Sequence, residues 1–334
     1  MLNSALARAA GSLTCLILLA VTAMASLVYG NIPVTISTLL DSLFAYDAGN
    51  IQHLVIRSER VSRTVVALTV GAGLAVAGVL MQSLTRNPLA SPGILGINAG
   101  ALFFVVAGAT LFSLSLPSDL IWLAFLGGGV AAGLVFTLGQ EPGQGLSPVR
   151  TVLAGVAITA LFVSFSQGLL MMNQDRLESL LFWLAGSVSG RSLDTVMGLL
   201  PIIAIAIVIT LLMTRQLNLL GMDDEVIQGL GLNVVRTRLL CVLLVIALAG
   251  TAVAIAGLIG FVGLIVPHIT RAIFGTDHRW LLPASALIGA ALLLIADTVA
   301  RLVIPPQEIP VGVVTALLGT PLFLHLARKT RSLT

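Results

Sequence analysis

Apolar residues dominate long, unbroken stretches of this chain and do not alternate with polar ones. A transmembrane helix needs about 20 predominantly apolar residues, and ten stretches reach or approach that length. They cover residues 11–30, 64–84, 94–112, 119–138, 151–172, 195–214, 239–257, 260–273, 281–303 and 310–327. The eighth stretch is the shortest. The pattern predicts an all-α integral membrane protein with about ten spans.

The composition supports the same conclusion. Of the 334 residues, 57% are hydrophobic and 9% are charged, and the mean hydropathy is +1.08. A water-soluble domain of this size needs many more charged residues to cover its surface. We therefore expect a single transmembrane domain over residues 1–334. Cys15 and Cys241 lie inside apolar runs, which suggests neither a disulfide nor a metal site.

The first thirty residues resemble a secretory signal. Arg8 precedes an apolar run at 13–21, and the small residues Ala23 and Ala25 follow it. The apolar character continues to Tyr29, which is long enough to cross a bilayer. A retained first span is the favoured interpretation.

Positive residues set the expected orientation, because short cytoplasmic loops carry an excess of Lys and Arg. An even number of spans places both termini on one side. With the termini inside, the cytoplasmic positives are Arg8, Arg86, Arg150, Arg215, Arg236, Arg238, Arg271, Arg279, Arg328, Lys329 and Arg331, and the outer ones are Arg57, Arg60, Arg63, Arg176, Arg191 and Arg301. The excess on the inside favours cytoplasmic termini.

Residues 215–238 are the one mid-chain segment that is polar yet patterned like a helix. The acids at 223–225 suit the positive end of a helix dipole, and Gly229 and Gly231 are expected to end the helix. A short polar helix between two spans, on the cytoplasmic side, could bind a soluble partner. An ordinary solvated loop is the alternative.

Two segments contain helix breakers. Residues 86–96 hold two prolines and two glycines, and residues 256–268 hold three glycines and a proline at membrane depth. Irregular backbone at that depth requires protein or water to satisfy it, and it often borders a transport path. Residues 74–78 and 253–257 are also similar in sequence. An inverted repeat of spans two to five and seven to ten would explain this similarity, and so would chance.

Arg57, Arg60 and Arg63 recur every third residue at the outer start of the second span. Helical spacing places them on one face, where they would present a positive patch to the outer compartment. An acidic partner could bind this patch. Anchoring to lipid headgroups is the alternative.

No catalytic or metal-binding constellation is visible. The phosphate-binding pattern GxxxxGK[ST] is excluded, because the only lysine, Lys329, follows Arg328. The four histidines show no ligand spacing: His53, His268, His278 and His325. We expect no enzyme activity, no metal and no cofactor on this chain, so any ATP is bound by another subunit.

Polar residues inside the spans are few. Asp297 and Arg301 are one helical turn apart and are expected to form a local ion pair, which leaves no evident proton or sodium relay. In the fifth span, Thr159 and Ser166 could line a path for a polar solute. Packing in the core, with each hydroxyl bonded back to its own helix, is an equal alternative.

Several ordered motifs resemble one family closely. They are 60–64 (RVSRT), 71–78 (GAGLAVAG), 81–82 (MQ), 86–96 (RNPLASPGILG), 153–155 (LAG), 182–186 (FWLAG), 261–268 (FVGLIVPH), 277–279 (DHR), 296–297 (AD) and 310–312 (PVG). From about residue 50 to the end, the chain resembles the permease subunits of bacterial iron-siderophore ABC importers, the FecCD-type family, which includes the cobalamin permease.

The resemblance implies a type II ABC importer permease in the bacterial inner membrane, paired with an identical or homologous second permease subunit. It implies two cytoplasmic ATPase subunits, which bind ATP and Mg and dock on the segment at about 215–238. The residues implied in coupling are Gly221, Asp223, Asp224, Glu225, Gly229, Gly231 and Leu232.

The resemblance also implies a periplasmic siderophore-binding protein whose acids meet Arg60, Arg63 and Arg301. A cytoplasmic gate corresponds to Ser147, Pro148 and Val149. This chain departs from the family pattern at Ser62, where a proline is common, and at Pro148 and Val149, which replace hydroxyl residues of the cobalamin member. An apolar gate would differ in its chemistry.

The predicted function is therefore translocation of a ferric siderophore, with a cobalamin or haem permease as the alternative. An ion-coupled secondary transporter is the alternative of another class. The sequence does not identify the siderophore or the second permease subunit.

Overall fold

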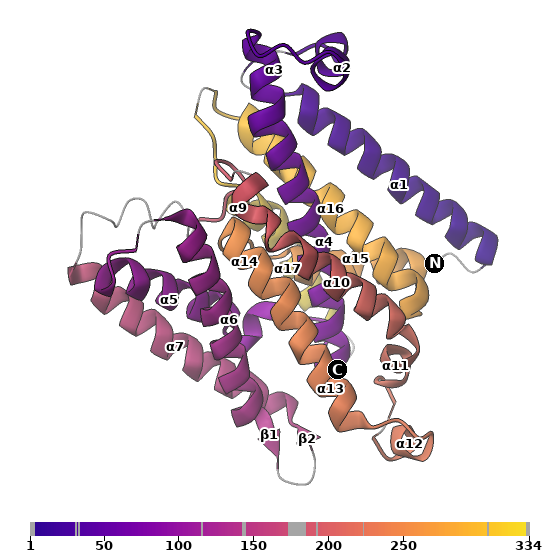
Figure 1. The fold of residues 1–334 in the computed structure, drawn as a ribbon. Helices are drawn as coiled ribbons and strands as arrows, with labels where there is room; N and C mark the ends of the chain where they lie inside the picture. The colour runs from indigo at the N-terminus through magenta and orange to yellow at the C-terminus, as the bar shows by residue number, and fades with distance from the viewer. Residues whose placement is uncertain are drawn as a thin grey trace.

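The structure is a computed structural model. It describes residues 4–30, 32, 34–114, 116–141, 145–172, 185–191, 193–222, 224–305 and 307–331. Within these ranges the chain is a bundle of helices with one short hairpin (Figure 1).

Ten apolar helical units correspond to the ten predicted spans. They are α1 (Ala5–Val28), α4 (Val61–Thr85), α5 (Ile97–Leu111), α6 (Pro117–Gly139), α7 (Pro148–Met172), α10 (Leu200–Leu212), α13 (Val234–Val245) with η4 (Ile246–Gly250) and α14 (Thr251–Ala256), α15 (Val262–Phe274), α16 (His278–Leu302) and α17 (Val311–Arg331). Six stretches are long and apolar enough to cross a membrane, and four apolar helices are shorter. The expected multi-span architecture is confirmed.

Shorter elements connect the spans. They are α2 (Ile36–Phe44), α3 (Ile51–Val55), the π-helical turn η1 (Ile56–Arg60), the 3₁₀ turn η2 (Pro92–Leu95), β1 (Gln140–Glu141), β2 (Gly145–Leu146), α9 (Leu193–Met197), α11 (Thr214–Leu219) and α12 (Asp224–Gly229). The sequence analysis expected only α12 among these helices. The others are too short for hydrophobic periodicity to separate them from loops.

Helix α4 lies in the centre of the bundle and packs antiparallel to α16. Both helices approach closely because glycines face each other: a Cβ at Gly71 would collide with the carbonyl of Gly289, and a Cβ at Gly78 would collide with that of Gly263 in α15. Close backbone approach of this kind replaces the hydrophobic driving force that lipid does not provide. The helices α4, α15 and α16 are therefore closely packed at the centre of the fold.

The two halves of the bundle share matching features. Gly96 before α5 and Phe261 before α15 both cap their helices in the left-handed region, with φ of 70° and 66°. Gly71 of α4 packs on Gly289 of α16, and in the same way Gly128 of α6 faces Gly250 of η4. A Cβ built at Gly128 would lie 3.9 Å from the Cα of Gly250. The first contact joins span two (α4) to span nine (α16), and the second joins span seven (η4) to span four (α6). Span two and span seven run in opposite directions, as α4 and α13 show in Figure 1. They support the inverted repeat of spans two to five and seven to ten.

The broken segment between α14 and α15 is satisfied by protein groups. The amide of Ser187 donates to the carbonyl of Ala256 at 2.8 Å, and Gly257 adopts φ 72°. A Cβ at Gly319 in α17 would collide with Phe261. The irregular backbone that the sequence predicted at membrane depth is therefore enclosed by α17 and the 185–191 segment.

Candidate functional site

Arg63 is the centre of an ion cluster at one end of the bundle. Its Nη2 lies 2.8 Å from Asp297 Oδ1, and its Nη1 lies 2.8 Å from Glu308 Oε2 and 3.1 Å from Ser189 Oγ. The expected Asp297–Arg301 pair also forms, at 2.9 Å. One guanidinium thus connects α4 with α16, with the segment that precedes α17 and with the segment that precedes α9.

Arg60 and Arg301 hold the C-terminal end of α1. Arg301 Nη1 donates to the carbonyls of Ser26 and Tyr29, at 3.2 and 3.1 Å, and Arg60 donates to those of Leu27, Val28 and Ile32. The last carbonyls of a helix have no intrahelical partner, and cations are favourable there. The two arginines therefore cap α1 and fasten it to α4 and α16.

The three arginines are buried, which differs from the expected exposed patch. Arg60, Arg63 and Arg301 are each 3% exposed, whereas Arg57 is exposed and lies 4.5 Å from the ring centroid of Tyr46. The π turn η1 places Arg57 on a different face from Arg60, while Arg60 and Arg63 are buried by their bonds to α1, α16 and Glu308. Docking by Arg60, Arg63 and Arg301 stays a prediction, and it requires these internal bonds to open.

Arg191 is a residue that the sequence analysis left unassigned. It lines a crevice of about 230 Å³ with Ser58, Glu59, Arg63 and Gly190. The Nε atoms of Arg63 and Arg191 are buried there without a hydrogen-bond partner among the described residues. Arg191 follows a glycine and lies outside any periodic hydrophobic pattern, so the sequence gave no indication that it lines this crevice.

The predicted coupling helix is present as α12. It ends at Gly229, and Gly231 follows with φ 80°, a conformation that favours glycine. Among the described atoms none lies within 4 Å of a Cβ built at Gly221, Gly229 or Gly231. Asp223 lies outside the described residues, and nothing is described of the side chains of Asp224 and Glu225. Leu232 donates its amide to the carbonyl of Ile227 at 3.2 Å.

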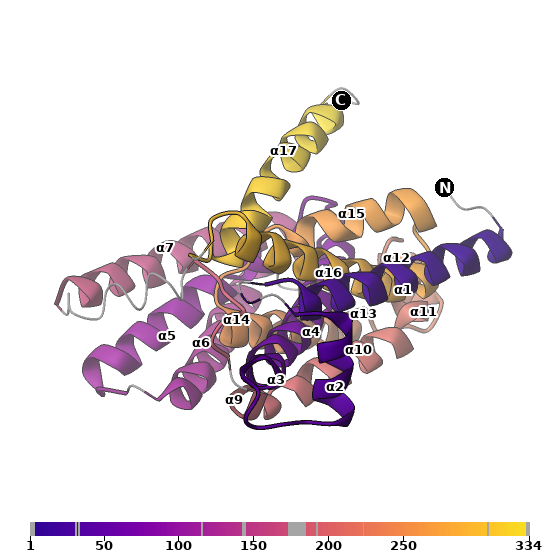
Figure 2. The ribbon, with the colours of Figure 1, turned by 90° about the horizontal axis from the view of Figure 1, so that it is seen from above.

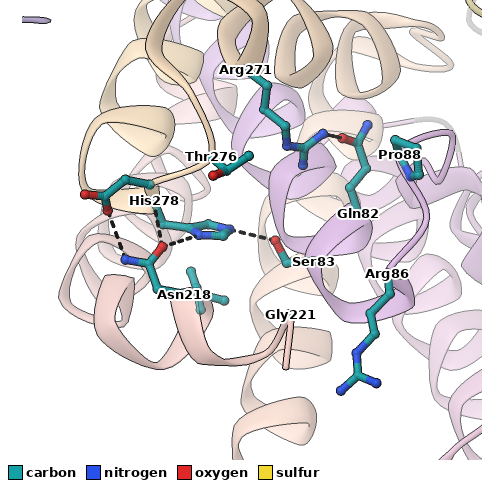
Figure 3. A pocket seen from close by; sticks show the side chains of 11 residues that line it. Gln82, Ser83, Arg86, Pro88, Asn218, Gly221, Arg271, Thr276 and His278 are labelled. Atoms are coloured by element: carbon teal, nitrogen blue, oxygen red, sulfur yellow. Dashed lines mark hydrogen bonds between the residues drawn. The ribbon is translucent and has the colours of Figure 1, made fainter. Parts of the chain in front are cut away.

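A cavity of about 580 Å³ lies behind this segment, between the end of α4, α11 and the turn from α15 to α16 (Figure 3). Arg86 lines it and donates to the carbonyls of Leu220 and Met222, which follow α11. Arg271 on the opposite wall donates to Gln82 of α4. The arginines thus fasten the segment after α11 to α4, and α15 to α4.

Asn218 and His278 form a hydrogen-bonded chain across the cavity (Figure 3). Asn218 Oδ1 accepts from the backbone N–H of His278 at 2.9 Å, and Asn218 Nδ2 donates to Asp277 Oδ1 at 2.9 Å. The ring Nδ1 of His278 lies 2.7 Å from Asn218 Oδ1 and therefore carries the proton. In the neutral ring Nε2 is then an acceptor for Ser83 Oγ at 2.8 Å, and it shares that hydroxyl proton with the carbonyl of Val79, at 2.9 Å.

The carboxyl group of Asp277 is held in its charged form. Burial acts to raise its pKa, but the hydrogen bonds from Asn218 and from the amide of Arg279, with the charge of Arg279, outweigh that effect, so the pKa lies below its ordinary value. The same carboxylate caps the N-terminus of α16. Asp277 is therefore a stable acceptor for Asn218.

The predicted gate lies where the β1–β2 hairpin meets α7. Ser147 accepts at its carbonyl from the amide and hydroxyl of Thr151, at 2.9 and 2.8 Å, and Val149 is 68% exposed. Nothing is described of the side chain of Pro148. The gate itself stays a prediction.

Of the two predicted path residues in α7, Ser166 is fully buried and donates to the carbonyl of Phe162 at 2.7 Å. Thr159 is half-buried next to Gly96. Their burial agrees with the alternative of core packing, whereas Ser164 and Gln167 are exposed among apolar side chains on the outward face of α7.

Metal ligands are not gathered in the described part of the chain, where no group of three or more His, Cys, Asp or Glu could hold an ion.

A helical bundle with broken spans, a polar helix at one end and buried charges at the other defines a permease subunit of a type II ABC importer. The chain belongs to the FecCD transport family, whose model matches residues 18–329. The resemblance found in the motifs is therefore confirmed.

Individual permeases and one solved transporter are similar to this chain over most of its length. YfiZ of Bacillus subtilis, described as a probable siderophore transport system permease protein, is 47% identical, with 95% of each chain covered. The ferric enterobactin transport system permease protein FepD of Escherichia coli is 41% identical, with 95% of this chain and 94% of FepD covered. A solved metal-chelate type ABC transporter in an inward-facing conformation has a TM-score of 0.84 at 33% identity, with 95% of this chain and 98% of that chain covered.

Proposed function

We propose that this chain is the inner-membrane permease subunit of an ABC importer that translocates a ferric siderophore. The observation that carries the proposal is the family match over residues 18–329, together with 47% identity to a siderophore permease across 95% of both chains. The subunit itself is a transport path, and partner ATPase subunits hydrolyse ATP.

The path is completed by a second permease subunit, identical or homologous. Support comes from the apolar faces that α7 and α17 leave uncovered: Leu153 and Val156 on α7 are 64% and 65% exposed, and Leu317 on α17 is 69% exposed. Figure 2 shows α17 leaving the body of the bundle. Large exposed apolar faces on one side of a subunit suit a partner or lipid.

The coupling segment lies on the cytoplasmic side, where two ATPase subunits dock on residues 221–232. Both termini lie on that side. Support comes from Arg8 near the start of α1, whose Nη2 would lie 3.9 Å from a Cβ built at Gly275, in the turn that leads to Asp277 beside the coupling segment. Helix α1 then ends at the opposite, outer cluster, and α17 starts just after Glu308 of that cluster.

A periplasmic binding protein docks on the outer end, and its acids engage the region of Arg60, Arg63 and Arg301. Because each of these guanidinium groups already has partners in the chain, docking carboxylates compete with Asp297, Glu308 and the carbonyls of α1. Binding-protein docking thereby loosens the contacts between α1, α4 and α16. ATP-driven closure of the ATPases then moves the inner end, and the gate at 147–149 opens.

Reconstitution tests this function. The permease, its ATPase and its binding protein are placed in vesicles, and uptake of ⁵⁵Fe-labelled siderophore is measured with ATP, without ATP, and without ATP under an imposed proton gradient. Uptake that depends on ATP and on the binding protein is expected. Uptake driven by the gradient alone would instead support an ion-coupled carrier. Uptake of haem or cobalamin, without uptake of the siderophore, would show that the protein is a haem or cobalamin permease.

A further inference from the structure

We propose that Asn218 is a positioning residue that transmits the displacement of the coupling segment to the central helices α4 and α16. The proposal rests on the proposed function, because it assumes that ATPases act on residues 221–232. Asn218 lies in α11, three residues before Gly221, and its side chain lines the cavity of Figure 3.

The contacts of Asn218 lead to both central helices. Asn218 Nδ2 lies 2.9 Å from Oδ1 of Asp277, the N-cap of α16. Asn218 Oδ1 lies 2.9 Å from the backbone nitrogen and 2.7 Å from the ring Nδ1 of His278, the first residue of α16. The ring of His278 continues to Ser83 in the last turn of α4 at 2.8 Å. Four polar side chains thus join α11, α16 and α4 in one connected network, and such networks act together.

The receiving helices can carry this displacement across the membrane. Helix α16 has 25 residues, and Asp297 lies nineteen residues after His278, about 28 Å along the axis. Along that length, Gly71 and Gly289 bring α4 and α16 into backbone contact, and Arg63–Asp297 joins them at the outer end. A shift imposed at His278 therefore reaches the outer ion cluster through a closely packed pair.

The chemistry of these contacts requires an amide at position 218. One oxygen accepts from two N–H groups of His278, and one NH₂ donates to the carboxylate of Asp277. Aspartate at 218 would retain the acceptor but lose the donor, and it would place a second negative charge against Asp277. Alanine would lose all three bonds.

Other contacts keep α11 in place when Asn218 is changed. Leu217 and Leu220 are 1% and 2% exposed, and Arg86 binds the carbonyls of Leu220 and Met222. Loss of the Asn218 amide therefore removes the link to α16 without releasing the segment. A residue that only stabilised the fold would have a different signature, namely reduced melting temperature at an unchanged ratio of transport to hydrolysis.

The experiment compares Asn218→Ala with the wild-type complex in vesicles. Asn218→Ala is expected to lower the amount of iron imported per ATP hydrolysed by about tenfold, because several hydrogen bonds are lost. The melting temperature and the ATP hydrolysis stimulated by the binding protein should stay close to wild type. Gln216→Ala is the matched control on the same helix, because the buried Oε1 of Gln216 has no hydrogen-bond partner among the described residues.

A charged variant sharpens the test. Asn218→Asp should uncouple transport as Asn218→Ala does, because Asp277 Oδ1, which accepts from Asn218 Nδ2 at 2.9 Å and from the amide of Arg279 at 3.0 Å, would then face a second carboxylate in place of a donor. An unchanged ratio in Asn218→Ala, or in Asn218→Asp, overturns the assignment of Asn218. Failure of the wild-type complex to import the siderophore would overturn the proposed function instead.

Discussion

The two ends of the α4–α16 pair are held together by different chemistry. At the outer end, Arg63, Asp297 and Arg301 are almost fully buried charges in direct contact. At the inner end, the neutral side chains of Asn218, His278 and Ser83 are joined by hydrogen bonds to one another and to the carboxylate of Asp277, beside a cavity of about 580 Å³. Removing one partner of a buried ion pair is strongly destabilising, whereas a neutral hydrogen bond contributes only about 1 kcal/mol net.

This difference suggests a division of roles. The outer end is fixed unless competing charges arrive, so it suits a contact that opens only when an acidic partner docks. The inner end can rearrange at a small cost, so it suits repeated movement during each ATP cycle. Testing the comparison requires variants at both ends whose effects on stability and on transport are measured separately.

The largest effect is expected for Arg63→Ala. It leaves Glu308 without its buried partner and Asp297 with Arg301 alone, and should destabilise the protein by about 3 kcal/mol, the lower end for a broken buried pair. Melting temperature in detergent measures this, with the exposed Arg57→Ala as control. If both variants melted like wild type, the outer cluster would not be the fixed end, and the comparison would fail.

A smaller effect on stability, with a clear effect on coupling, is expected for Gly231→Val. Its φ of 80° costs a branched residue about 1–2 kcal/mol, while the space around Gly229 and Gly231 is open among the described atoms. Uptake should fall more than ATP hydrolysis does. Equal losses of uptake and hydrolysis in Gly231→Val would contradict a coupling role.

The smallest effect is expected for Arg191→Ala. Arg191 is half-buried in the crevice and is not one of the arginines that fasten α1, α4 and α16, so the melting temperature should change little while the affinity for the binding protein falls a few-fold. The loss should shrink as salt is raised. Titration of the binding protein against hydrolysis at two salt concentrations measures it, and a salt-independent loss would argue against an electrostatic contact.

Particular residues show where prediction from sequence succeeded and where it failed. The ten apolar stretches, the breaks at 86–96 and 256–268, the helix at 224–229 and the Asp297–Arg301 pair followed from hydropathy and spacing. The burial of Arg60 and Arg63 did not, because their partners are carbonyls and carboxylates far away in the chain. The network of Asn218, His278 and Ser83 was missed for the same reason.

The sequence by itself determined that the chain spans a membrane and belongs to a permease family, because bilayer thickness sets span length and long motifs preserve family identity. Only the tertiary structure decided what each polar residue contacts. A buried guanidinium or amide is defined by the groups that several helices bring to it, and that meeting depends on how glycines such as Gly71 and Gly78 let those helices pack.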